Sequence, residues 1–110
     1  KVLTLIQNGA VPAVPFLWIQ EVGSSLIKAR RARGITLATF NRAVNELDSI
    51  LYETHSIAYG IADLVRLAKA YNLQGYDAVY FDLAKRLGIP MASVDRGIRS
   101  ACKNHAVTLL

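Results

Sequence analysis

Helical periodicity alternates with short apolar runs along this chain. Between residues 37 and 51, apolar side chains recur every three or four positions, which predicts an amphipathic helix with Thr36 as its N-cap. Further helices are predicted over residues 15–33, 58–72, 76–87 and 95–104, and a helix end at Gly9. The apolar runs at residues 10–14, 89–94 and 106–110 predict strands, and residues 54–57 suggest a strand end. This alternation is typical of an α/β fold in which helices cover a parallel sheet.

Length, composition and charge limit the size of the domain and the kinds of partner that we expect. The chain has 110 residues, of which 53 % are hydrophobic and 19 % charged, so we expect one domain over residues 1–110. A domain this apolar either buries both faces of a sheet or has surface that a partner covers. The net charge of +5 is compatible with a polyanion partner. A single cysteine, Cys102, fits a reducing compartment, and no apolar run is long enough for a membrane span. We therefore expect a cytoplasmic location.

Two aspartates flank the segment from residue 77 to residue 95. Eleven helical steps from Asp77 to Gly88 cover about 16 Å, and six extended steps from Ile89 to Asp95 cover about 20 Å. A turn at Gly88 reverses the chain, so Asp77 and Asp95 are predicted to lie at the same end of the domain. In open parallel sheets, ligands bind at the carboxyl edge of the strands, which is this end.

An alternative interpretation remains open for each acid. Aspartate is a favoured residue at helix N-termini, so Asp77 and Asp95 could serve only to stabilise their helices. Glu21 lies on the predicted helix over 15–33, where the apolar stripe points away from it, and a pair with Lys28 in solvent would explain it. The small residues Gly23, Ser24 and Ser25 beside Glu21 would also leave room for a ligand.

Three segments together resemble a known family. "VPFLWIQEVGSSLIKARRARGIT", "LQGYDAVYFDLAKRLGIPMASVD" and "ACKNHAVTLL" are similar to the PIN-domain ribonucleases, specifically VapC-type toxins of toxin–antitoxin pairs. The resemblance implies a PIN-like three-layer fold with a short parallel sheet flanked by helices. It also implies that Glu21, Asp77 and Asp95 bind Mg²⁺ or Mn²⁺, with Ser93 as a supporting residue. The family's first acid belongs to an N-terminal strand that this sequence does not contain, so the domain is expected to be N-terminally incomplete.

The resemblance further implies an activity and partners. The expected activity is metal-dependent hydrolysis of RNA phosphodiesters, since a hard divalent cation held by carboxylates activates water and offsets charge on the phosphate. The expected partners are the RNA substrate, a cognate antitoxin and a second copy of the chain. Cations that could contact RNA phosphates are Lys28, Arg31, Arg33, Arg96 and Arg99. The first three could instead complete a helix C-terminus.

Two rival functions are compatible with the same residues. One is a non-catalytic protein-interaction module whose acids only cap helices. The other is a plain nucleic-acid binder that uses the cations at residues 28–33. No combination of His55, His105 and a nucleophile forms a plausible hydrolase triad in this sequence.

Overall fold

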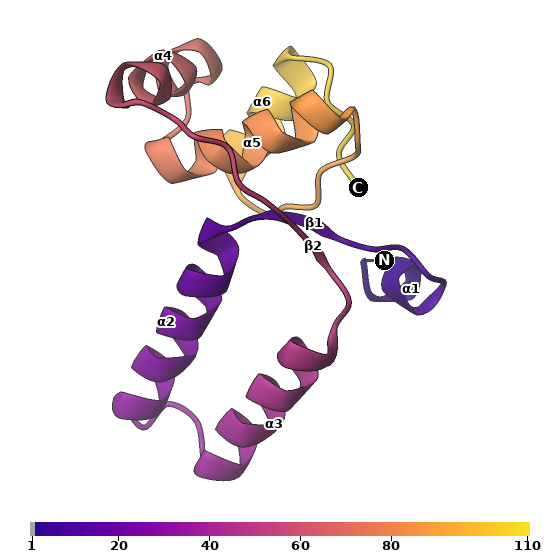
Figure 1. The fold of residues 1–110 in the computed structure, drawn as a ribbon, viewed down its shortest axis with the longest axis vertical. Coiled ribbons are helices and arrows are strands. Elements are labelled where there is room, and N and C mark those ends of the chain that lie inside the picture. Colours follow the sequence, from indigo (N-terminus) through magenta and orange to yellow (C-terminus); the bar gives the residue numbers. More distant parts are fainter. Residues whose placement is uncertain (1) are drawn as a thin grey trace. The chain divides into compact units, whose positions relative to one another are not determined.

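The computed structural model describes residues 2–110, which form six helices and two short strands (Figure 1). In chain order these are α1 (Val2–Gln7), β1 (Ala13–Pro15), α2 (Leu17–Arg31), α3 (Leu37–Ser49), β2 (Glu53–His55), α4 (Ile61–Tyr71), α5 (Gly75–Leu87) and α6 (Arg96–Asn104). The fold is therefore mixed α/β, as the sequence pattern predicts. Among residues 2–110, no helix combines the length and the apolar character that crossing a bilayer requires.

The described chain divides into two compact units. One unit contains residues 2–10 and 55–110, and the other contains residues 11–54. In the first unit, α5 packs against both α4 and α6. The core cluster of this unit consists of Leu73, Ala78, Phe81, Ala84, Met91, Ile98, Ala101 and Cys102. The single domain expected over residues 1–110 stays a prediction.

Helix α5 supplies the centre of this core. Phe81 is fully buried, and its ring lies 4.7 Å from the ring of Tyr71 at the end of α4. The helix ends at Gly88, which adopts a left-handed conformation with φ of +64°. A residue with a Cβ rarely adopts this conformation, so glycine suits the position at which the chain reverses.

Beyond Gly88, the two apolar runs pair only briefly. Met91 donates its N–H to the carbonyl of Thr108 at 2.8 Å and accepts the N–H of Leu110 at 2.9 Å. These bonds form one parallel bridge between Met91 and Leu109. The predicted strands over 89–94 and 106–110 are thus reduced to a single bridge with the predicted parallel direction.

The unit of residues 11–54 joins a helical hairpin to a two-stranded sheet. Strands β1 and β2 run parallel, and Glu53 donates its N–H to the carbonyl of Pro12 at 2.8 Å (Figure 1). Helices α2 and α3 pack together. Thr36 caps α3 as predicted, because its side chain accepts the N–H of Thr39 at 3.1 Å. In the described chain, neither helix of this hairpin carries a buried residue.

Element boundaries differ from the sequence-based expectations at several places. Pro15 was expected to begin a helix but belongs to β1, and α2 begins at Leu17. The strand expected over 10–14 is found at Ala13–Pro15. The strand end expected over 54–57 is found at Glu53–His55. Proline has no N–H to donate, so Pro15 is equally compatible with a strand end and a helix start, which explains the error.

Candidate functional site

Asp95 is the N-cap of α6. Its Oδ2 accepts the N–H of Ile98 at 2.9 Å, and Ser93 Oγ accepts the N–H of Asp95 at 3.1 Å. The helix-capping role considered for Asp95 is therefore confirmed, and Ser93 holds the backbone of the same turn. A carboxylate offers about four acceptor positions. The cap bond at Asp95 consequently does not use up its capacity to bind a cation.

Asp77 lies in the first turn of α5 and is half-buried. The start of α6 is close to the start of α5. Gly97 is the second residue of α6 and Leu73 lies two residues before α5, and a Cβ added to Gly97 would lie 3.4 Å from Cδ2 of Leu73. Asp77 and Asp95 are thus carried by neighbouring helix N-termini of one unit, as their spacing in the sequence predicts. Aspartate is a favoured residue in the first turn of a helix, where the backbone N–H groups lack helical partners.

Glu21 belongs to the other unit. It is an exposed residue of α2, while Asp77 and Asp95 belong to the unit that contains α5 and α6. Within either unit, the described residues contain no group of three or more His, Cys, Asp or Glu side chains that could hold a metal ion. Asp77 and Asp95 nevertheless carry ligands of the kind that Mg²⁺ takes, since this ion commonly binds one or two carboxylates and completes its shell with water and phosphate oxygens.

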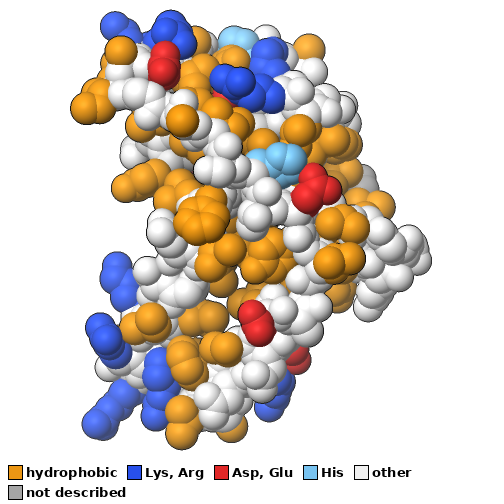
Figure 2. All heavy atoms as spheres, viewed as in Figure 1, with side chains coloured by type: hydrophobic (Ala, Val, Ile, Leu, Met, Phe, Trp, Pro, Cys, Tyr) orange, Lys and Arg blue, Asp and Glu red, His pale blue; other side chains and the backbone are white. Residues whose placement is uncertain are grey.

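The predicted phosphate-binding cations gather at two places. Lys28 and Arg31 lie in the last turn of α2, and Arg33 follows the helix with a left-handed φ of 56°; all three are exposed. Figure 2 shows Lys and Arg side chains together around this end of α2. Arg30 of the same run has a structural bond, since its Nη1 donates to the carbonyl of Ile35 at 3.1 Å. Arg96 and Arg99 are both exposed on α6, and Arg96 directly follows Asp95.

Asp82 is a buried carboxylate with two side-chain partners, which the sequence did not predict. This carboxylate is only 5 % exposed, and its Oδ2 lies 2.6 Å from Tyr59 Oη and 2.6 Å from Arg86 Nε. Burial, followed by the hydrogen bond to Asp82, raises the pKa of Tyr59 to about 12. The hydrogen bond to Asp82 also raises the pKa of Arg86. The three side chains tie the segment before α4 to α5.

One signal for this buried carboxylate was present in the sequence. Arg86 follows Asp82 by four residues, which is the spacing of an ion pair on one helix face. Apolar residues Phe81 and Leu83 flank the acid, which indicates a helix with little solvent around it. Tyr59 lies 23 residues away, and no local pattern points to it.

Comparison with known proteins adds evidence on the fold. Neither protein-family models nor curated proteins gave a match to this chain. Among solved structures, the chain is similar to PAE2754 from Pyrobaculum aerophilum, with a TM-score of 0.70 and 24 % sequence identity over 88 % of this chain. The similar region spans 66 % of that protein's length. At this level of identity the likeness shows a shared α/β fold.

Proposed function

We propose that this chain is part of a divalent-metal-dependent endoribonuclease of the PIN-domain type, related to VapC toxins. The observation that carries the proposal is the placement of Asp77 and Asp95 at the neighbouring starts of α5 and α6. Resemblance of the surrounding motifs to that family and the α/β fold support it. Glu21 is proposed as a third metal ligand on the same grounds of resemblance.

Each residue has a definite task in this proposal. Asp77 and Asp95 offer hard oxygen ligands, and the cap bond to Ile98 holds the Asp95 carboxylate in one orientation. Ser93 fixes the turn that presents Asp95. Arg96 places a cation next to Asp95, where it would bind the substrate phosphate. A bound Mg²⁺ or Mn²⁺ would supply Lewis-acid activation of water and offset the charge that develops on the phosphodiester.

The proposed partners are a cognate antitoxin and a second copy of the chain. Large apolar side chains are exposed on the unit of residues 11–54, including Phe16 at 56 % and Leu37 at 56 %. Exposed apolar surface of this kind favours a protein partner that covers it. The cations at Lys28, Arg31 and Arg33 favour contacts with RNA phosphates, which would make RNA binding depend on salt concentration.

A substitution at Asp95 can separate metal binding from helix capping. Asparagine is about as good an N-cap as aspartate, so Asp95→Asn keeps the cap and removes the charge. We expect Mn²⁺ to raise the melting temperature of the wild type and of the control Asp48→Asn, which lies on the exposed side of α3. In Asp77→Asn and Asp95→Asn the shift should be absent, and cleavage of single-stranded RNA should fall at least tenfold.

The second candidate is a non-catalytic protein-interaction module. The hydrogen bond that Ile98 donates to Asp95 favours it, because a helix cap is sufficient to explain this acid. This candidate predicts that Mn²⁺ leaves the melting temperature of every variant unchanged and that RNA stays intact. It also predicts that Asp95→Ala lowers stability by about 1 kcal/mol while Asp95→Asn does not. Indifference to Mn²⁺ in the wild type would therefore refute the nuclease.

A further inference from the structure

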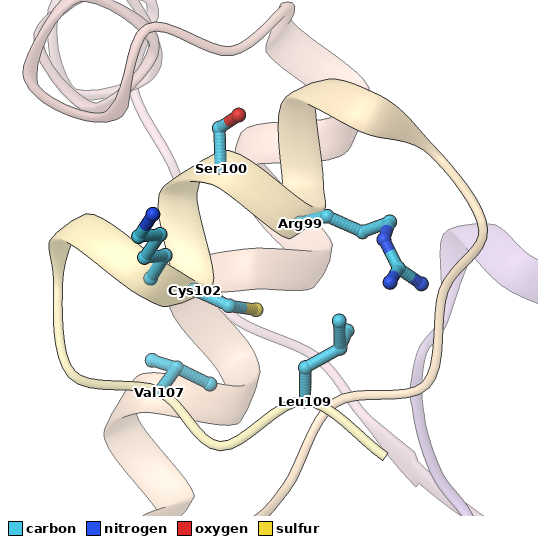
Figure 3. A pocket seen from close by; sticks show the side chains of 6 residues that line it. Arg99, Ser100, Cys102, Val107 and Leu109 are labelled. Carbon is cyan, nitrogen blue, oxygen red and sulfur yellow. The ribbon is translucent and has the colours of Figure 1, made fainter.

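A groove lies between α6 and the C-terminal segment of the chain. It has a volume of about 440 Å³ and is lined by Arg99, Ser100, Cys102, Lys103, Val107 and Leu109. Figure 3 shows Cys102 pointing toward Leu109, with the side chain of Arg99 extended alongside Leu109. The groove thus has an apolar floor and a charged rim.

The backbone beside this floor has polar groups that the pairing with Met91 does not use. Thr108 accepts the N–H of Met91, and Leu110 donates its N–H to the carbonyl of Met91. In a parallel pairing, the residue between two such bonded neighbours directs its N–H and C=O to the opposite side. The backbone groups of Leu109 therefore face away from Met91, which is the geometry of an edge that another extended segment can join.

The charge at the rim has one sign. Residues 96–110 contain Arg96, Arg99 and Lys103 and no Asp or Glu. Arg99 and Lys103 are exposed and lie four residues apart on α6, a rise of about 6 Å along the helix. Alternate residues of a strand lie on one face about 7 Å apart. Side chains at alternate positions of an extended segment would therefore match the spacing of Arg99 and Lys103.

We propose that the groove binds an extended peptide segment of another protein, with an apolar residue facing Cys102 and Leu109 and an acidic residue two positions away. The apolar side chain would fill the floor, and the carboxylate would pair with Arg99 or Lys103. The peptide backbone would bond to Leu109 as an added strand. The groove is lined by neither Asp77 nor Asp95, so the proposal holds for the nuclease and for the interaction module alike.

A designed peptide tests this proposal directly. The probe is a fluorescent, terminally blocked peptide with leucine, glutamate and leucine at alternate positions and threonine between them. We expect saturable binding in fluorescence anisotropy and about tenfold weaker binding to the double variant Arg99→Glu, Lys103→Glu. The matched control is Arg42→Glu with Lys69→Glu, which makes the same change in net charge at exposed positions outside the groove. Melting temperatures of both double variants establish that they remain folded.

Two altered peptides test the chemistry of the occupant. A peptide with lysine in place of glutamate, and one with N-methylated backbone amides, should each bind at least tenfold more weakly. Equal binding of either peptide, absence of saturable binding, or unchanged affinity in the groove variant would overturn the proposal. Displacement of the probe by single-stranded RNA would assign the groove to nucleic acid, and would overturn it as well.

Discussion

The phenolic oxygen of Tyr59 lies 2.6 Å from Oδ2 of the buried Asp82. Arg86 donates to the same carboxylate oxygen through Nε, also at 2.6 Å. One oxygen atom therefore accepts hydrogen bonds from two donors, one on the segment before α4 and one on α5. A buried carboxylate is stable only when its acceptors are satisfied, so both donors contribute to the stability of this unit.

Replacement of Tyr59 by phenylalanine should lower the free energy of unfolding. The change removes one of the two donors to a buried acceptor, which costs about 1 to 2 kcal/mol. Urea denaturation at pH 7 measures the loss. Tyr76→Phe is the control, because Tyr76 is 66 % exposed and should change stability by less than about 0.5 kcal/mol. Equal effects of the two substitutions would contradict the structural role of Tyr59.

Stability should fall in alkaline solution through the same residue. Burial and the bond to Asp82 raise the pKa of Tyr59 to about 12 in the folded chain, whereas an unfolded tyrosine ionises near 10. Above pH 10, the folded state therefore holds a proton that the unfolded state has lost, and the free energy of unfolding declines as pH rises toward 12. Urea titrations at pH 9 and pH 11 should show a larger decline for the wild type than for Tyr59→Phe. A Tyr59→Phe variant that declines as steeply as the wild type would rule out this origin.

Asp63 should titrate below the ordinary range of an aspartate. Its Oδ2 accepts the N–H of Gly60 at 3.1 Å, and its Oδ1 pairs with Arg66 at 3.1 Å. Both contacts lower the pKa of Asp63, and the bond from Gly60 is the larger cause. The stability from this carboxylate is present above the unfolded pKa and is lost as pH falls through the lowered folded value.

An NMR titration of the Asp63 carboxyl carbon measures this shift. Arg66→Ala should move the pKa of Asp63 part of the way toward its ordinary value, because the Gly60 bond remains. Arg42→Ala, on α3, should leave the titration unchanged. Complete loss of the shift in Arg66→Ala would show that the bond to Gly60 has no effect on the pKa.

Cys102 should react slowly with thiol reagents. It is 3 % exposed in the core, and its burial raises the pKa of the thiol. Only the thiolate is nucleophilic, so a raised pKa and poor access both slow alkylation. Iodoacetamide at pH 8 should modify the folded protein much more slowly than the urea-unfolded protein, as mass spectrometry can follow. Equal rates in the two states would show that the thiol is accessible.

The amino-acid sequence predicted the helices better than the strands. Helical periodicity and the cap at Thr36 are local signals, and both were correct for α3. Strand pairing depends on residues far apart in the chain, and the apolar runs around Met91 and Leu109 gave no information on how few backbone bonds would form. Boundaries near Pro15 failed because proline is compatible with two conformations.

The candidate site was predictable only where it depends on local features of the chain. The chain reversal at Gly88 and the lengths on either side predicted that α5 and α6 start at the same end. The closeness of Leu73 to Gly97 bears this out, because a Cβ added to Gly97 would lie 3.4 Å from Cδ2 of Leu73. Tyr59 as a partner of Asp82 was not predictable, because the two residues meet only through the packing of α4 on α5. The metal-binding roles of Glu21, Asp77 and Asp95 remain predictions.

The core cluster has a consequence for how the chain folds. All of its members lie between Leu73 and Cys102, on α5, α6 and the segments next to them. Because the entropy lost on closing a loop grows with loop length, contacts within such a short stretch form at little cost. Topologies rich in local contacts collapse and order rapidly. Helices α4, α5 and α6 follow one another in the chain, and α5 packs on both of its neighbours, so these three helices can order together early in folding.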